Sequence, residues 1–267
     1  MPTYPTSQPI TASVEIVSGV VHVVATDRED TVVEVSPRDP DCAADVRVAE
    51  NARIDFRNGT LTVSAGRRFV SLGRSGAVVV EIELPSRSRL HVSSASARLH
   101  AEGVFGDCRS ATASGDAAIE SVTGNIKADS ASGGITVDKL NGEAVVSTAS
   151  GDAAFGEVTG DVRLRAASGS LSVRRLRGTV NAQTASGDVA VAAAVTGEIS
   201  VQTASGDVEV GIGEGTVARL ELRTHSGTVR NGLESTDGPG QAEETLGVNV
   251  RTGSGDVTVR RATVAAL

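Results

Sequence analysis

Apolar and polar residues alternate in short runs along most of this chain, and from the middle onward the runs recur about every 18 residues. Counted from the glycine of each Ala-Ser-Gly as zero, apolar residues favour offsets +2, +4, +7, +11 and +13. In the repeat at Gly187 these are Val189, Val191, the Ala194-Val195 pair after a one-residue insertion, Ile199 and Val201. Alternation with a period of two is typical of β-strands. Each repeat therefore predicts two short strands.

Two files of glycine divide each repeat into halves. The first file follows Ala-Ser and consists of Gly115, Gly133, Gly151, Gly169, Gly187 and Gly206; the second consists of Gly106, Gly124, Gly142, Gly160, Gly178 and Gly197. A turn-forming residue at every ninth position predicts a chain that turns at regular intervals, so that successive coils stack on one another. We therefore predict an all-β fold, a single-stranded parallel β-helix or β-solenoid with coils of about 18 residues. The usual handedness of parallel crossovers favours a right-handed coil, and antiparallel hairpins of the same period are the alternative.

Three segments are predicted along the chain. Residues 1–92 lack the repeat register but alternate like strands, so we expect an N-terminal β-strand cap that is continuous with the solenoid. Within it, Ser18-Gly19 is interpreted as a turn between two strands, and no helix is expected. Residues 93–231 carry the solenoid repeats. Residues 232–267 hold a polar, acidic loop, expected to cover the open edge of the solenoid, and then closing strands.

The amino-acid composition limits which residues can form the core and which classes of partner are expected. The chain has no Trp, one Tyr and four Phe, so its interior must be built from Val, Ala, Leu and Ile in thin layers. A net charge of −8, with no aromatic residues interleaved among cations, argues against nucleic acid as a partner. One pair of cysteines is no disulfide framework, and Cys108 falls at a repeat position that Ile126 and Val162 also occupy. We therefore expect Cys108 to be a small buried apolar residue.

The beginning of the chain and its hydropathy bear on location. Residues 1–19 show no basic start followed by an apolar stretch, and no segment has 18 consecutive apolar residues. We expect a soluble, cytoplasmic protein without membrane insertion.

The serine, glycine and aspartate at each Ala-Ser-Gly turn are the most regular polar residues of the chain. We expect them to form a structural turn ladder whose main members are Ser114, Gly115, Asp116, Ser150, Gly151, Asp152, Ser186, Gly187, Asp188, Ser205, Gly206 and Asp207. Serine at a tight turn can bond to nearby backbone groups. No His or Lys recurs beside the serines as a base, so the pattern predicts no catalytic residue.

The residue after each glycine could instead form a calcium ladder, because nine-residue Gly and Asp repeats occur in calcium-binding β-rolls. The neutral residues Gly134 and Ser170 interrupt the row between Asp116, Asp152 and Asp188. Two carboxylates stacked about 4.8 Å apart repel by about 1 kcal/mol even in water, so this alternation suits a ladder without metal. We expect each Asp to cap its own turn, and no metal or cofactor to be bound.

The repeated TASGDV unit, the strand EIELP ahead of it and the closing motifs RTHSGTVRNGLE and VRTGSGDVTV resemble the bacterial β-strand-repeat family of candidate adhesins, whose function is unknown. The resemblance covers nearly the whole chain. It implies a β-solenoid with a binding or scaffold role, and it transfers no catalytic residues.

These observations lead to one main hypothesis and two alternatives. The main hypothesis is a non-enzymatic structural or interaction protein, adhesin-like in fold, that binds a protein partner through its flat polar faces. The first alternative is a cytoplasmic scaffold that associates with itself, similar to the bactofilins. The second alternative is a calcium-binding β-roll.

Overall fold

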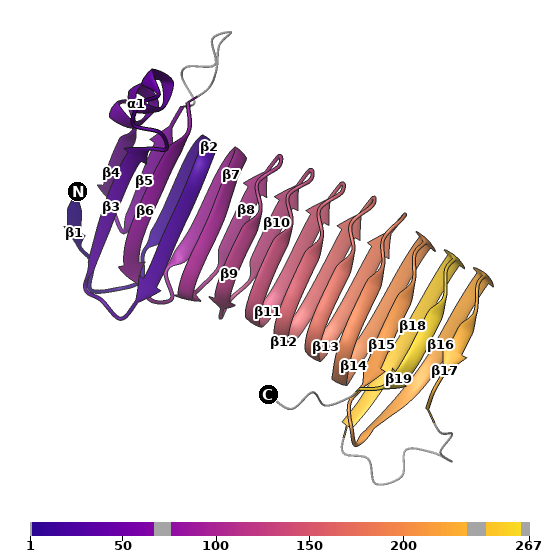
Figure 1. Cartoon of the computed structure of the whole chain (residues 1–267). Helices are drawn as coiled ribbons and strands as arrows, with labels where there is room; N and C mark the ends of the chain where they lie inside the picture. Colours follow the sequence, from indigo (N-terminus) through magenta and orange to yellow (C-terminus); the bar gives the residue numbers. More distant parts are fainter. Residues whose placement is uncertain (1, 67–75, 234–243, 263–267) are drawn as a thin grey trace. The chain divides into compact units, whose positions relative to one another are not determined.

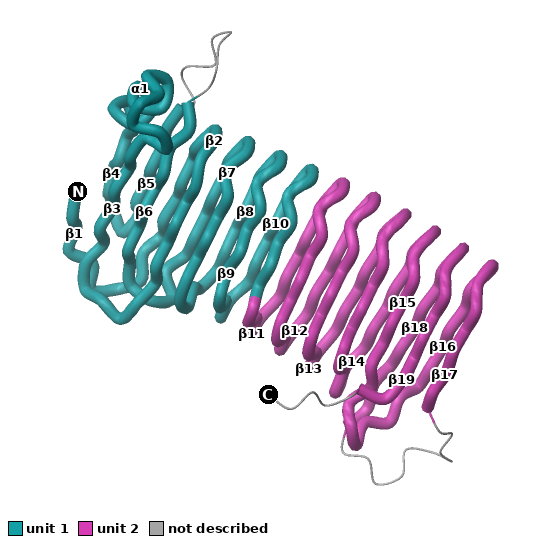
Figure 2. Tube along the Cα trace, viewed as in Figure 1, with its two compact units in different colours: residues 1–137 teal, residues 138–267 magenta. Residues whose placement is uncertain are grey.

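The computed structural model describes all residues except 1, 67–75, 234–243 and 263–267, and it is built almost entirely of β-strands (Figure 1). The chain divides into two compact units, residues 1–137 and 138–267 (Figure 2). Each unit is described by itself. The predicted segment boundaries at residues 92 and 231 stay a prediction.

Unit 1 contains β1 (Thr3–Pro5), β2 (Thr11–Thr26), β3 (Asp30–Pro37), α1 (Ala43–Glu50), β4 (Arg53–Arg57), β5 (Thr60–Ala65), β6 (Val78–Pro85), β7 (Arg89–Phe105), β8 (Cys108–Thr112), β9 (Ala117–Val122) and β10 (Ile126–Ser130). Strand β11 (Ile135–Thr148) runs from unit 1 into unit 2. Unit 2 continues with β12 (Ala153–Ala166), β13 (Leu171–Thr184), β14 (Val189–Ser205), β15 (Val208–Ile212), β16 (Thr216–Ser226), β17 (Val229–Asn231), β18 (Glu244–Ser254) and β19 (Val257–Arg261).

The repeats of unit 2 stack as parallel layers. Strands β12, β13 and β14 pair in parallel, so that Val162 lies beside Val180 and Val180 beside Ile199. In β12, β13 and β14 the five predicted apolar offsets are buried; in β12 they are Ala153, Phe155, Val158, Val162 and Leu164. The β-solenoid prediction is therefore confirmed, and antiparallel hairpins are wrong for these repeats. The handedness of the coil stays a prediction.

The second glycine file differs from the predicted turns. Gly160, Gly178 and Gly197 lie inside continuous strands, with φ angles of +133°, +139° and +115°. These angles suit glycine because it has no Cβ, and they bend the strand without ending its pairing. Gly19 does the same in β2, with φ +137°, so the predicted Ser18-Gly19 turn is also a bend. In unit 1, the chain breaks into separate strands β9 and β10 around Gly124, as predicted.

Strand β2 is the first long strand of the chain, yet it lies between two later coils of unit 1. Its first half pairs in parallel with β5 on one side and β7 on the other. Its second half lies in the same way between β6 and β7. Beyond this coil, β4 pairs antiparallel with β5, β3 with β6, and β1 with β3. Antiparallel strands therefore end the parallel stack of unit 1. They lie within residues 1–92, where a strand-rich cap was predicted.

Helix α1 corrects the prediction that the chain has no helix. Its eight residues, AADVRVAE, are mostly good helix formers, but they bury only Asp45 and Val48. The Asp45 carboxylate accepts hydrogen bonds from the backbone N–H of Asp39 at 3.1 Å and of Ala77 at 2.9 Å. These bonds hold the helix against the ends of the neighbouring strands. A helix this short leaves little apolar periodicity in the sequence to reveal it.

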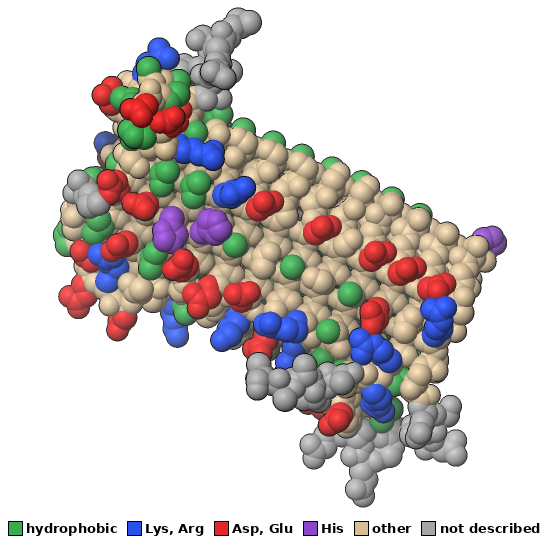
Figure 3. All heavy atoms as spheres, viewed as in Figure 1, with side chains coloured by type: hydrophobic (Ala, Val, Ile, Leu, Met, Phe, Trp, Pro, Cys, Tyr) green, Lys and Arg blue, Asp and Glu red, His purple; other side chains and the backbone are tan. Residues whose placement is uncertain are grey.

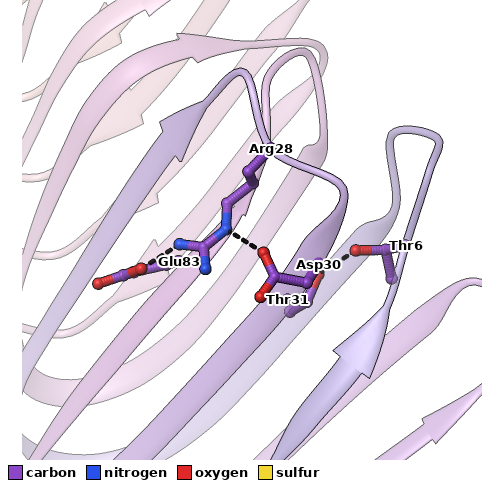
Figure 4. Close-up of polar contacts among 5 residues, drawn as sticks. All are labelled: Thr6, Arg28, Asp30, Thr31 and Glu83. Carbon is purple, nitrogen blue, oxygen red and sulfur yellow. Dashed lines mark hydrogen bonds and ion pairs between the residues drawn. The ribbon is translucent and has the colours of Figure 1, made fainter.

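A polar cluster joins the first strands of unit 1 (Figure 4). The Arg28 guanidinium donates to Asp30 at 2.8 Å and also to Glu83. Beside it, the buried hydroxyls of Thr6 and Thr31 share a hydrogen bond of 2.8 Å. The cluster connects β3, β6 and the turn after β2, so it ties the antiparallel strands to the parallel stack.

The last strands of unit 2 are also out of chain order. Strand β18 lies between β14 and β16, and β19 lies between β15 and β17. The strands expected to close the solenoid therefore form an inner layer, and β16 with β17 forms the outermost layer of the described residues. Most of the acidic loop predicted to cover the edge, residues 234–243, lies outside the described residues.

Candidate functional site

The aspartates of the turn ladder bond from one layer to the next. Asp116 Oδ1 accepts a hydrogen bond from the N–H of Gly134 at 3.0 Å, and Asp152 Oδ1 accepts one from Ser170 at 2.8 Å. We predicted that each Asp would bond within its own turn, and this is wrong. The donor is the backbone N–H of the residue 18 positions later, in the next layer. The repeat length could have suggested this, since equivalent residues of adjacent layers lie only about 4.8 Å apart.

In unit 2 the ladder follows the order of the layers in space. Asp188 Oδ1 accepts from Asp207 N–H, Asp207 from Asp256 and Asp256 from Thr228, each at 2.8 Å. Ser170 takes the place of an aspartate, because its Oγ accepts from Asp188 N–H at 3.3 Å. The side chains therefore satisfy backbone groups at the exposed turns.

The serines and glycines of the ladder lie at the same turns. Ser114, Ser150, Ser186 and Ser205 are exposed, and Ser114 Oγ donates to the Ala95 carbonyl at 3.4 Å. Gly115, Gly151 and Gly187 are buried, and Gly206 is half-buried. A Cβ on Gly187 would overlap the Gly169 carbonyl oxygen of the preceding layer. This overlap explains why glycine stands at this position of the turn. The ladder thus has contacts typical of structure.

The carboxylates of the ladder are spread along the stack. Among the residues that the structure describes, no group of three or more His, Cys, Asp or Glu side chains is placed to hold a metal ion. The oxygens of Asp116, Asp152 and Asp188 named above already accept backbone hydrogen bonds. The turn ladder therefore supplies no built calcium site within the described ranges.

An open groove of about 880 Å³ crosses β12, β13, β14 and β18 in unit 2. One wall is an exposed row of polar side chains, Arg165, Gln183, Gln202 and Arg251, and the opposite wall is a row of small residues, Ala167, Ala185, Ala204 and Gly253. The floor consists of Thr148 at the end of β11 and of Ala166, Thr184, Thr203 and Thr252. Each row runs across the strands because equivalent residues pair between layers. We did not predict the groove, because the recurrence of threonine in the repeated TASGDV unit does not tell that these residues line a common surface.

The polar wall has a distinct charge. Arg251 pairs with Arg223 of β16 in the sheet register, so the row continues beyond the groove with a third arginine. No carboxylate belongs to this row, while the chain as a whole carries a net charge of −8. Glu221 of the neighbouring row contacts Arg223 at 2.8 Å and Arg251 only at 3.9 Å. Arg165 has no ion pair within the described part of the chain.

The groove floor presents hydroxyl groups with weak internal bonds. Thr184 and Thr252 each donate to a glycine carbonyl at 3.5 Å, which is the long limit for a hydrogen bond. Within the described ranges, Thr203 Oγ1 is buried without a partner. Thr148 is the exception, because its Oγ1 accepts from the Gly151 N–H at 2.7 Å. The other three threonine hydroxyls of the floor are weakly bonded or unpartnered, in contrast to the oxygens of the aspartate ladder.

Other chemical features of the chain lie away from this groove. Cys108 is 4% exposed, as predicted, and burial raises the pKa of its thiol to about 12, with a smaller effect from the charge of Asp107. On the face shown in Figure 3, acidic and basic side chains lie among one another. No helix among the described residues is long and apolar enough to cross a membrane.

Solved structures offer distant likenesses. A candidate adhesin of Bacteroides fragilis is 12% identical and has a TM-score of 0.45, with 97% of this chain and 95% of the other covered. A candidate adhesin of Parabacteroides distasonis is 13% identical with a TM-score of 0.40, covering 97% and 96%. A candidate cell adhesion protein of Clostridium sporogenes is 10% identical with a TM-score of 0.22, covering 97% and 98%. No curated protein matches the chain.

A family model gives the firmer result. It matches residues 21–260, which include most of the parallel strands of both units and the whole of β18. The chain therefore belongs to the Toastrack DUF4097 family.

Proposed function

We propose that this protein is a non-enzymatic interaction protein, and that the groove of unit 2 binds an extended, acidic segment of a protein partner. The observation that carries this proposal is the row of Arg165, Gln183, Gln202 and Arg251, which forms one wall of the groove. Its members recur at the strand spacing of about 4.8 Å, so an extended ligand along the groove meets a donor at each layer. Arginine and glutamine side chains both donate to carboxylates.

The composition of the groove supports binding without catalysis. Its lining consists of Thr, Arg, Ala, Gln and Gly, and it includes no His, Cys, Asp, Glu or Lys. A threonine hydroxyl becomes a nucleophile only when a neighbouring base activates it, and the lining includes none of the side chains that most often serve as a general base. The small-residue wall leaves room for a backbone to approach. The cytoplasmic location expected from the sequence stays a prediction.

The test measures binding of a fluorescent poly-L-glutamate peptide to the full chain by anisotropy. The double variant Arg165→Gln, Arg251→Gln copies the residues that already stand between these arginines, so the fold should tolerate it. We expect at least about tenfold weaker binding, because two charge-assisted contacts lose their charge. Added salt should weaken the wild-type interaction.

The matched control is Arg109→Gln, which removes an exposed arginine from β8 in unit 1. This variant should bind the peptide like the wild type. A neutral Gly-Ser peptide of the same length should not bind. Equal loss of affinity in both variants, or no binding of the acidic peptide at all, would refute the acidic-segment proposal.

A further inference from the structure

The outermost described layer of unit 2 leaves its core side chains partly uncovered. In β16, Leu220 and Leu222 point inward in register with Val248 and Val250 of β18. The two β18 residues are 2% and 0% exposed, whereas the two leucines are only half-buried. Val229 of β17 is 42% exposed. The apolar core of unit 2 is therefore open at this end of the described residues.

The backbone of this layer is also open. Strand β16 pairs with β18 along one edge, and no other described strand pairs along its second edge. A free strand edge offers a row of unpaired N–H and C=O groups to another strand. The end of unit 1 differs, because β4, β3 and β1 close it with antiparallel pairing and β1 includes Pro5. The end strands of unit 1 are thus paired antiparallel, whereas β16 of unit 2 has one edge unpaired among the described strands.

The sequence of β16 is complementary to itself when two copies run antiparallel. With Leu220 opposite its own copy, Arg219 of each strand faces Glu221 of the other, and Leu222 faces Ala218. A register centred on Glu221 would oppose like charges, and one centred on Leu222 would set Leu220 against Thr224. The register centred on Leu220 therefore satisfies both the charges and the apolar positions.

We infer that a second copy of this chain docks on the β16 edge, so that the two β16 strands pair antiparallel about a two-fold axis at Leu220. Such a pairing continues the sheet and covers the half-buried leucines of both copies. An isologous contact of this kind closes on itself, so it gives a discrete dimer rather than a filament. The groove is lined by a different set of residues, although Glu221 of the β16 edge lies 3.9 Å from Arg251 of the groove wall.

The test is sedimentation equilibrium of the full chain across a concentration series. We expect a monomer–dimer equilibrium for the wild type. Glu221→Arg places arginine opposite arginine twice in the dimer and should weaken association at least about tenfold. Adding Arg219→Glu to that variant restores both opposite-charge pairs and should restore the dimer. Because Glu221 also contacts Arg223 at 2.8 Å within its own strand, Arg223→Gln is a second control: it removes that contact and should leave the dimer intact.

The control variant is Glu209→Arg, which disturbs the contact with Arg260 between β15 and β19 but leaves the β16 edge unchanged. It should sediment like the wild type and should bind poly-L-glutamate as the wild type does. A wild-type chain that stays monomeric at about 100 μM, or a dimer that Glu221→Arg leaves intact, overturns the inference. Species that grow steadily with concentration also overturn it, in favour of end-to-end stacking. If Glu221→Arg alone fails to fold, comparing the dimerisation of the double variant with that of the wild type still tests the inference.

Discussion

Single residues of this protein are constrained mainly by how closely the layers approach one another. Gly178 illustrates the constraint, since it combines a φ of +139° with a position against the Gly160 carbonyl. A side chain there must displace the neighbouring backbone. The same argument holds wherever two glycines of the second file are stacked.

Gly178→Ala should therefore destabilise unit 2 by more than about 2 kcal/mol, because backbone strain and overlap with Gly160 add together. The measurement is urea unfolding followed by circular dichroism. Gly247→Ala is the matched control, since a Cβ there would meet only ordinary contacts, at 3.6 Å from Glu198 and 4.0 Å from Gly197. The control should change stability by less than about 0.5 kcal/mol. Equal effects of the two substitutions would contradict the stacking argument.

Cys108 gives a second prediction at this scale. Its thiol has a pKa of about 12, raised by burial, so at pH 8 almost none of it is the reactive thiolate. A thiol reagent should label one cysteine, Cys42, in the native protein and both cysteines in urea. Mass spectrometry of the labelled peptides distinguishes them. Rapid native labelling at Cys108 would mean that this part of unit 1 opens readily.

At the scale of elements, the sequence was most informative about what points inward. The five apolar offsets follow from alternation within a strand, and the structure buries them in β12, β13 and β14. Hydrogen-bonding partners were harder to predict. Alternation does not tell whether Asp188 bonds within its turn or to the next layer, because both donors are exposed backbone groups near a turn. Helix α1 was missed because only Val48 of its apolar side chains is buried.

The antiparallel end of unit 1 should loosen in acid. The hydrogen bond from Arg28 lowers the pKa of Asp30 below its ordinary value of 3.8, with a further contribution from the charge of Arg28. A carboxyl with a depressed pKa in the folded state contributes stability above its unfolded pKa and loses it as the pH falls through the folded pKa. The contribution should therefore be present at pH 5 and disappear below about pH 4.

Tyr4 reports this change, because it is the one tyrosine of the chain and stacks on Phe56 of β4 at 5.0 Å. Its fluorescence should change as the pH falls below about 4, ahead of the loss of circular dichroism from the stacked layers. Arg28→Gln should reduce the depression of the Asp30 pKa and shift the change to higher pH. If Arg28→Gln leaves the pH dependence of the fluorescence unaltered, then protonation of Asp30 does not cause the change in acid.

At the scale of the whole molecule, the order of the layers could not be predicted from the repeat. Every half-coil carries apolar residues at the same offsets, so each can stack on any other with its core side chains aligned. Leu220 matches Val248 in the structure, but it would match Ile199 equally well. The insertion of β18 between β14 and β16 depends on the connections between strands and on the total number of layers, which periodicity does not encode.

This equivalence predicts what a shortened chain will do. A protein that ends at residue 233 lacks β18 and β19, and its β16 should move one layer inward to pair directly with β14. Gln202 of β14 and Arg223 of β16 both pair with Arg251, on its two sides, so in the full chain they are two layers apart. Two strand spacings amount to about 10 Å, which is too far for a disulfide, whereas one spacing of about 4.8 Å permits it.

The double variant Gln202→Cys, Arg223→Cys, placed in a Cys42→Ser background, separates the two arrangements. Under mild oxidation the full chain should stay uncrosslinked, and the shortened chain should form the intramolecular disulfide, detected as a shift on non-reducing gels. A shortened chain that loses its circular dichroism instead would mean that β18 is required for the fold of unit 2. Crosslinking in the full chain would show that β16 already exchanges between layers. The expected result would mean that the inserted strands set the order of equivalent layers, because the layers themselves carry no signal that fixes it.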